Sequence, residues 1–382
     1  MEQILNTGVA NTLAGNDRIT GIGKDYGFKN VGTLNTDDGN DTIIGTANIT
    51  GTGITISFGS TLDTGKGNDE IRGTGNAEGI VNMGTFNTSD GNDQISGVGM
   101  ISGFINADTG TFNTGDGDDG ISGAGNNYGF VNLGAFSTDD GDDTISGFSI
   151  RDGIINDSGN ILDTGNGNDI LSGNGSVAIR NGGTIITGNG EDSIIYSGNF
   201  INRGVVFLED GNDLIANRTS SNSNLENFNF IGTGDGDDTI TNARIIYNEG
   251  VINTGNGNDS IIANGSIYNN GGSINTGDGN DSIIANGGFE SGSNSSGSVF
   301  LGEGEDYIKG FGSGDFYGGN GNDTLELTPG TYTVGIWGEG SESPIFTKGN
   351  QLMITSEFEK LKAGSTIYDF TSLTAGQIII VA

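Results

Sequence analysis

The sequence predicts an all-β protein, a parallel, right-handed β-solenoid of about fourteen coils with a small β cap at its C-terminal end. Three observations predict this fold. A short glycine-rich acidic turn recurs fourteen times, and apolar residues keep a fixed distance from every copy of it. Apolar types make up only 32% of the 382 residues, too few for the thick core of an ordinary globule.

The recurring turn has the sequence Gly-(Asn/Asp/Glu)-Asp. Its copies lie 17 to 28 residues apart, within the range of solenoid repeats. Glycine here indicates a tight turn, because it adopts backbone angles that are closed to other residues. The fourteen copies end at Asp17, Asp41, Asp69, Asp93, Asp119, Asp143, Asp169, Asp192, Asp213, Asp238, Asp259, Asp281, Asp306 and Asp323.

Apolar residues stand at two fixed positions around each of these motif aspartates. Ile or Leu follows two residues later in every copy, as at Ile43 and Ile261, and an apolar residue precedes by seven, as at Phe86 and Ile252. The β-branched residues beside the turn favour strands. One coil offers too few apolar side chains to fold alone, so we expect parallel stacking around a thin continuous core.

A second corner, Asn-x-Gly, lies between successive motif turns. Examples are Asn82–Gly84, Asn132–Gly134, Asn202–Gly204, Asn248–Gly250 and Asn270–Gly272. Asn and Gly both tolerate the left-handed backbone region, so Asn-x-Gly indicates the turn opposite the motif. Stacked asparagine ladders and turn chemistry explain these corners without a functional role.

The chain is strongly acidic, with a net charge of −35. This charge excludes nucleic acid as a partner, because both surfaces would repel each other. The absence of Cys and His removes the usual ligands of soft metals and leaves oxygen donors, which suit Ca²⁺ or Mg²⁺. There is no apolar run long enough to span a membrane and no classical N-terminal signal peptide.

The turn Gly-x-Gly-x-Asp-x-(Ile/Leu) resembles the nonapeptide of the repeats-in-toxin (RTX) family, the hemolysin-type calcium-binding repeat. Gly318–Leu325 matches the family pattern throughout, whereas most other copies carry Thr in place of the first Gly, as at Thr36 and Thr254. The resemblance implies that each motif aspartate helps to bind the ions above and below it. It also implies calcium ligation at the turn glycines Gly39, Gly67, Gly91, Gly117, Gly141, Gly167, Gly211, Gly236, Gly257, Gly279 and Gly321.

Family repeats run in tandem, two per coil, whereas this chain has one motif in each longer coil. We therefore expect calcium along one edge of the solenoid only. Ca²⁺ needs six to eight oxygens, more than one turn supplies, so each ion would lie between two stacked turns. Fourteen turns leave thirteen gaps and thus room for up to about thirteen ions. We expect folding to require calcium, because the bare carboxylates would repel each other.

The repeat ends at Asp323, which suggests a repeat domain at 1–323 and a cap at 324–382. The tail carries both prolines and the single Trp337, and it ends in the apolar run Ile378–Ala382. It resembles the segment that follows the repeats in RTX proteins exported by type I secretion. This resemblance implies an extracellular or cell-surface protein that folds in the millimolar calcium outside the cell.

The function that we predict is a secreted calcium-binding structural or adhesive protein of a surface layer, matrix or cell contact. Possible partners are saccharides, a cell surface, and a second copy bound at the open N-terminal edge. No catalytic constellation is visible, and the lack of His excludes a Ser-His-Asp triad.

Two alternatives remain. One is a polysaccharide lyase, epimerase or hydrolase that uses off-motif residues such as Arg151, Asp152, Asp157, Tyr247 and Glu249. The other, less favoured, is an ice-binding module. The outward turn positions are mostly Asp or Asn rather than Thr, as at Asp116, Asn166, Asn189 and Asp235.

Overall fold

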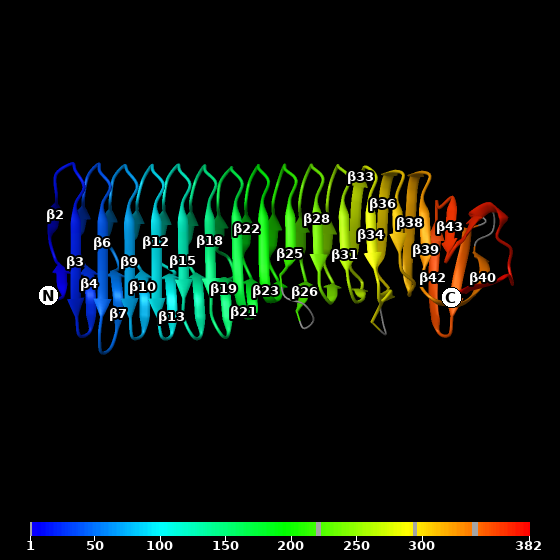
Figure 1. Cartoon of the computed structure of the whole chain (residues 1–382), viewed down its shortest axis with the longest axis horizontal. Coiled ribbons are helices and arrows are strands. Elements are labelled where there is room, and N and C mark those ends of the chain that lie inside the picture. Colours follow the sequence, from blue (N-terminus) through cyan, green and yellow to red (C-terminus); the bar gives the residue numbers. More distant parts are fainter. Residues whose placement is uncertain (1, 219–222, 293–295, 338–342) are drawn as a thin grey trace. The chain divides into compact units, whose positions relative to one another are not determined.

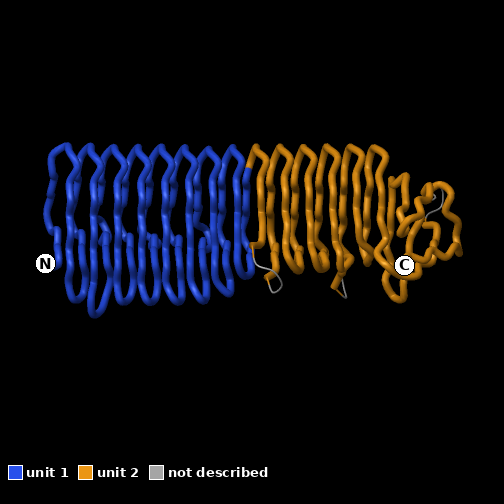
Figure 2. Tube along the Cα trace, in the orientation of Figure 1, with its two compact units in different colours: residues 1–208 blue, residues 209–382 orange. Residues whose placement is uncertain are grey.

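The computed structural model describes residues 2–218, 223–292, 296–337 and 343–382. It consists almost entirely of short strands, with a single 3-10 turn, η1 (Phe370–Ser372), in the described ranges (Figure 1). The chain divides into two compact units, residues 1–208 and residues 209–382 (Figure 2). This division falls within the repeats, whereas the predicted boundary at 323 marks the last motif turn.

Each unit is a parallel β-solenoid in which a coil contributes strands to three ladders. Figure 1 shows the coils lying side by side within each unit. In each coil, the strand of the first ladder comes directly after the motif turn. The strand of the second ladder comes next along the chain, and the strand of the third ladder leads into the next motif turn. In the described residues the strands of these three ladders pair in parallel with those of neighbouring coils, so the predicted parallel β-solenoid is confirmed.

In residues 1–208 the first ladder contains β3 (Arg18–Gly23), β6 (Thr42–Ala47), β9 (Glu70–Gly75), β12 (Gln94–Gly99), β15 (Gly120–Ala124), β18 (Thr144–Phe148), β21 (Ile170–Asn181) and β23 (Ser193–Asn202). The second contains β1 (Ile4–Asn6), β4 (Tyr26–Asn30), β7 (Thr52–Ile56), β10 (Glu78–Asn82), β13 (Ser102–Asn106), β16 (Tyr128–Asn132) and β19 (Asp152–Asn156), continued by the ends of β21 and β23. The third contains β2 (Val9–Asn11), β5 (Thr33–Asn35), β8 (Thr61–Asp63), β11 (Thr85–Asn87), β14 (Thr111–Asn113), β17 (Ala135–Ser137), β20 (Ile161–Asp163), β22 (Thr184–Ile186) and β24 (Val205–Phe207).

In residues 209–382 the first ladder contains β25 (Leu214–Asn217), β28 (Thr239–Asn242), β31 (Ser260–Ala263), β34 (Ser282–Ala285), β37 (Tyr307–Lys309), β39 (Thr324–Leu327) and β43 (Lys360–Ala363). The second contains β26 (Asn224–Asn227), β29 (Ile245–Asn248), β32 (Ile267–Asn269) and β35 (Phe289–Glu290). The third contains β27 (Phe230–Gly232), β30 (Val251–Asn253), β33 (Ser273–Asp278), β36 (Ser298–Gly304), β38 (Gly314–Gly321) and β42 (Gln351–Ser356).

The core is thin and consists of columns of inward side chains, one residue per ladder and coil. Both predicted columns are buried, as Ile95 and Phe112 show. A third column, which includes Phe104 and Phe130, fills the second ladder. Aromatic rings stack between coils, with ring centroids 5.3 Å apart for Phe104 and Phe130. Burial of such side chains stabilises each coil by about 1.5–3 kcal/mol per residue.

The Asn-x-Gly corners are present, between the strands of the second and third ladders. Neither the asparagine nor the last glycine of the five corners has a positive φ, although the middle residue Gly271 does. The asparagines instead form a buried ladder, in which Asn82 Nδ2 donates to Asn106 Oδ1 at 2.9 Å. Glycine allows the backbones of neighbouring coils to approach closely at this corner, since a Cβ on Gly84 would lie 2.3 Å from the carbonyl oxygen of Ser60.

Residues 324–382 continue the stack and then change its direction. Strands β42 and β43 pair in parallel with β38 and β39, as one further partial coil. Three other strands pair antiparallel, namely β40 (Gly330–Trp337), β41 (Ser343–Lys348) and β45 (Ile378–Val381), and β44 (Thr366–Asp369) does so with β43. Among the described residues, no helix has the length and apolar character needed to cross a lipid bilayer.

Candidate metal centre

The motif aspartates form a buried column in each unit. Their side chains point inward, and those of Asp93, Asp169 and Asp323 have no exposed surface. One carboxylate oxygen, Oδ1, accepts a hydrogen bond from the backbone N–H of the motif aspartate in the preceding coil, at 2.7–2.9 Å. Each aspartate therefore links two consecutive turns.

The second carboxylate oxygen, Oδ2, defines the site. In eleven motif aspartates of the described ranges this oxygen is buried and accepts no hydrogen bond. In Asp169 it accepts one from the hydroxyl of Thr164, at 2.5 Å. A buried carboxylate oxygen without a donor is costly unless a proton or a cation compensates it. The eleven are Asp17, Asp41, Asp69, Asp93, Asp119, Asp143, Asp238, Asp259, Asp281, Asp306 and Asp323.

Burial weakens the acidity of these carboxyls. It raises the pKa of Asp93 and Asp143 to about 8, and that of Asp69 and Asp119 to about 7. The backbone N–H of the preceding coil, which donates to Oδ1, opposes this shift in each of the four cases. Near neutral pH the carboxyl groups of this column can therefore bind either protons or cations.

The turn glycines add backbone oxygens to the same column. The eleven predicted glycines have φ between 137° and 158°, angles that residues with a side chain rarely adopt. A Cβ on Gly117 would lie 2.1 Å from the carbonyl oxygen of Gly91, and one on Gly257 would lie 1.9 Å from that of Gly236. The carbonyl of one turn therefore points at the next turn along the stack.

The sequence prediction omitted three glycines and one glutamate that belong to this edge. Gly15, Gly190 and Gly304 occupy the same turn position, with φ of 138°, 146° and 152°. Glu359 continues the carboxylate column past the last motif, because its Oε2 accepts the backbone N–H of Asp323 at 2.7 Å. The motif spacing identifies the glycines, but no sequence signal identifies Glu359, which stands 36 residues after Asp323.

The donor set consists of oxygen alone. No three Asp or Glu side chains of the described residues gather closely enough to hold a metal ion as carboxylates only. Stacking explains this, since a gap between two turns brings together one motif aspartate from each. An ion there needs main-chain carbonyls as well, and a mixture of carboxylate and carbonyl oxygens is the environment that Ca²⁺ prefers. The residues therefore fit a hard cation between consecutive turns.

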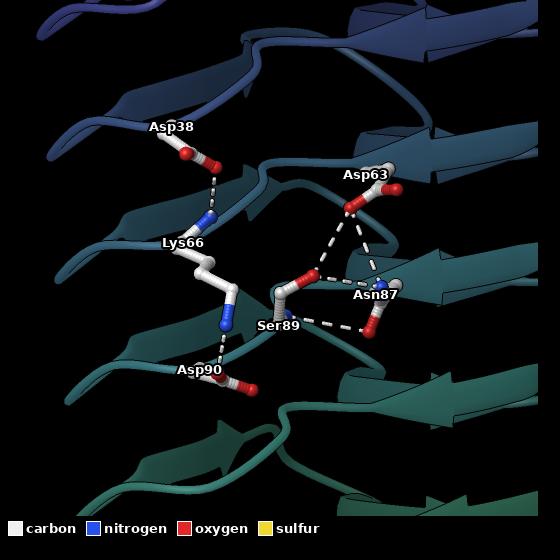
Figure 3. A network of polar contacts seen from close by, with 6 residues as sticks. All are labelled: Asp38, Asp63, Lys66, Asn87, Ser89 and Asp90. Carbon is white, nitrogen blue, oxygen red and sulfur yellow. Dashed lines mark hydrogen bonds and ion pairs between the residues drawn. The ribbon is translucent and has the colours of Figure 1, made fainter.

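The outer lip of this edge is polar and cross-linked between coils (Figure 3). The backbone N–H of Lys66 donates to Asp38, and its ammonium group forms an ion pair with Asp90. Deeper in the turn, Asn87 Nδ2 donates to Asp63 Oδ1 at 3.3 Å and to Ser89 Oγ at 3.0 Å. The four residues considered for ice binding, Asp116, Asn166, Asn189 and Asp235, are exposed along this lip.

The off-motif candidates for catalysis form two clusters, one in each unit. In the first unit Asp152 is 3% exposed and forms ion pairs with Arg151 at 3.4 Å and Arg180 at 2.9 Å. Asp157 lines a groove together with Tyr128 and Arg180. In the second unit the Tyr247 hydroxyl donates to Glu249.

No family model matches the chain, and no curated protein matches it by sequence. The chain is similar to one solved protein described as a hyperactive, Ca²⁺-dependent, β-helical antifreeze protein from an Antarctic bacterium, known from an X-ray crystal structure. The two share 16% sequence identity over 96% of this chain and 95% of the other, with a TM-score of 0.43. At this identity the likeness concerns the fold alone.

Proposed function

We propose that this chain is a calcium-binding β-solenoid that holds its ions between consecutive motif turns. The observation that supports this proposal is the column of buried Oδ2 atoms that accept no hydrogen bond. A solenoid needs polar turns, but it does not need an unsatisfied carboxylate at the same place in each coil. A cation between two turns would satisfy these oxygens and offset the cost of their burial.

Calcium fits this position better than magnesium or zinc. The ligands are turn carbonyls and aspartates at the irregular spacing that two stacked loops impose, and Ca²⁺ tolerates irregular coordination. Mg²⁺ demands a near-ideal octahedron and keeps several of its waters. Zn²⁺ prefers Cys and His, which this chain lacks. The resemblance of the turn to the RTX nonapeptide agrees with this choice.

The proposed role is structural or adhesive, outside the cell or at its surface. Calcium sites built from loop carbonyls and shared carboxylates suit the millimolar calcium found there. Type I secretion through residues 324–382 is part of the same proposal. The fourteen turns would hold up to about thirteen ions, with seven gaps between the eight turns of residues 1–208 and five between the six turns of residues 209–323.

We propose a binding role rather than catalysis. Asp152, the buried carboxylate among the off-motif candidates, forms ion pairs with two arginines, which favours a structural role for it. A panel of neutral and anionic polysaccharides, assayed for cleavage and epimerisation, tests the enzymatic alternative. Product formation that is lost in Asp152→Asn or Glu249→Gln would favour catalysis.

The deciding experiment is a calcium titration of a sample stripped with EDTA, followed by far-UV circular dichroism up to 10 mM. We expect a cooperative transition from coil to β structure that magnesium reproduces weakly or not at all. Isothermal titration calorimetry of the same sample gives the number of ions. A full β signal at pH 8 in EDTA, unchanged by calcium, would show that the turns are stable without metal.

A further inference from the structure

Three aromatic side chains form a strip on the outer face of the second ladder in residues 209–382. Phe228, Tyr247 and Tyr268 belong to three consecutive coils. Ring centroids are 5.8 Å apart for Phe228 and Tyr247, and 6.3 Å apart for Tyr247 and Tyr268. All three are half-buried, so part of each ring faces solvent. These residues follow the motif aspartates by 9 to 15 positions and lie outside the motif turns, so calcium binding does not explain them.

Acidic and amide side chains surround this aromatic strip. Glu226 pairs in register with Tyr247, and Glu290 with Tyr268, so a carboxylate stands at each end of the tyrosine pair. Asn270 Nδ2 donates to Glu249 Oε1 at 3.0 Å and to the Tyr247 hydroxyl at 3.3 Å. The Tyr247 hydroxyl itself donates to Glu249. This network fixes Tyr247 and keeps Glu249 ionised, because its hydrogen bonds lower the pKa of the carboxyl.

A groove of about 340 Å³ opens over this strip. It is lined by Asn224, Glu226, Phe228, Ile245, Tyr247 and Tyr268. This volume lies in the range of small-ligand sites, and the combination of apolar surface with a few polar groups is characteristic of them. A sugar ring has the complementary chemistry, with an apolar C–H face and hydroxyl groups around its rim.

We propose that this strip binds an extended, neutral polysaccharide that runs along the coils. The inference rests on the proposed adhesive function and specifies its ligand. Consecutive strands are about 4.8 Å apart, close to the length that one sugar residue adds to an extended chain, so successive sugars would meet successive coils. Aromatic rings would contact the C–H faces, while Glu226, Glu249 and Asn224 accept hydrogen bonds from hydroxyl groups.

The charge around the groove selects among polysaccharides. Glu226, Glu249 and Glu290 would repel uronic acids and sulfated sugars at close range. Arg244, between β28 and β29, is exposed, and its guanidinium donates to Asn224 Oδ1 at 3.4 Å. Neutral chains incur no such repulsion, so the site favours them.

The test is affinity electrophoresis of the full, calcium-loaded chain in gels that contain β-glucan, β-mannan, soluble chitin oligomers, alginate or polygalacturonate. We expect retardation by at least one neutral polysaccharide and none by the two anionic ones. Tyr247→Ala and Tyr268→Ala should each weaken the binding about tenfold. The matched control is Tyr317→Ala, which removes a half-buried tyrosine stacked on Phe300 at 4.8 Å, outside the groove. It should leave binding within about twofold of the wild type.

Glu290→Gln tests the charge argument separately, because Glu290 lies beside Tyr268 but outside the groove lining. It should increase retardation by polygalacturonate severalfold and leave binding of the neutral chain within about threefold. Circular dichroism in calcium establishes that each variant folds. A wild type that folds with calcium but binds no neutral polysaccharide overturns this inference and leaves the calcium proposal intact. Equal losses in Tyr247→Ala and Tyr317→Ala, or preferential binding of anionic chains, overturn it as well.

Discussion

At the scale of the residue, two neighbouring aspartates in one turn have opposite roles. Asp119 is buried in the carboxylate column, whereas Asp118 is exposed and accepts hydrogen bonds from Asp142 N–H and Asn92 Nδ2. The substitution Asp119→Asn should raise the calcium concentration at the folding midpoint severalfold, because it removes an anionic ligand from two gaps. Calcium titration by circular dichroism measures the shift.

Asp118→Asn is the matched control, since it removes the same charge one residue away. We expect it to shift the midpoint by less than twofold. Equal shifts for both variants would mean that calcium responds to the net charge of the edge rather than to the buried column.

The turn glycines give a second prediction at this scale. Gly117 has φ of 143° and no room for a Cβ, which would lie 2.1 Å from the Gly91 carbonyl oxygen. Gly159 has φ of 82° and nothing within 4 Å of the position of a Cβ. In excess calcium, Gly117→Ala should lower the free energy of unfolding by more than about 2 kcal/mol, and Gly159→Ala by about 1 kcal/mol. Chemical denaturation measures both, and a similar loss in the two variants would contradict the crowding argument.

At the scale of the element, the sequence was informative where the repeat spacing is constant. Apolar residues keep fixed distances from the motif aspartate, such as Ile95 two residues after one copy and Phe112 seven residues before another. These distances predicted the first and third ladders and the edge formed by the motif turns. The second ladder was missed. Its core residues lie 11 residues after the motif at Phe104 and 13 after it at Ile54, because the connecting loops differ in length.

The asparagine ladder follows from the repeated Asn-x-Gly corner, since side chains such as Asn106 bond to the coils above and below. One other feature depends on contacts that no local pattern encodes. Glu359 was missed because the antiparallel strands of the cap separate it in sequence from Asp323. The chain then returns to the stack, where β43 pairs with β39 and Glu359 accepts the Asp323 N–H.

The asparagine ladder leads to a prediction for this element. Asn106 is fully buried, donates to Asn132 Oδ1 and to the Ala135 carbonyl, and accepts from Asn82 Nδ2. Asn106→Ala should cost about 2–3 kcal/mol, because it leaves buried partners in both adjacent coils unsatisfied. Thermal unfolding in excess calcium measures the loss. The control is Asn126→Ala, in the exposed loop between β15 and β16, which should change stability by less than about 0.5 kcal/mol.

At the scale of the whole molecule, the buried carboxylates make stability depend on pH in opposite ways with and without calcium. The pKa values of Asp69, Asp93, Asp119 and Asp143 rise from 3.8 to about 7 or 8 on folding. Between pH 4 and 8 the folded chain thus binds more protons than the unfolded chain, and calcium-free stability should fall as pH rises through this window. Calcium needs the deprotonated form, so its stabilising effect should grow over the same window.

Melting temperatures in EDTA and in 10 mM calcium at pH 5, 6, 7 and 8 test this pair of trends. We expect the two curves to diverge as pH rises. A calcium-free chain that becomes more stable from pH 5 to pH 8 would mean that the column is not held by protons in the absence of metal.

In the first unit, two kinds of motif turn alternate from coil to coil. Deletion of one pair of coils should therefore change the number of bound ions without changing the fold. The residue four positions before the motif aspartate is Asp37, Ser89 or Asp139 in one set of coils and Gly65, Gly115 or Gly165 in the other. All six have positive φ. Residues 65–114 thus form one two-coil step, and Thr85–Asn87 of β11 pairs directly with both β8 and β14.

Deletion of residues 65–114 should join Thr64 to Gly115 and bring β8 and β17 into the sequence of coils without loss of phase. It removes the turns of Asp69 and Asp93, so we expect a folded protein that binds two fewer calcium ions. Deletion of residues 65–89 removes one coil and one residue more, so it joins Thr64 to Asp90 and omits the residue four positions before Asp93. It should therefore destabilise the stack. Calorimetry compares the stoichiometry of the deletion variants with that of the full chain. An unchanged number of ions after loss of residues 65–114 would place the calcium elsewhere than in the stacked turns.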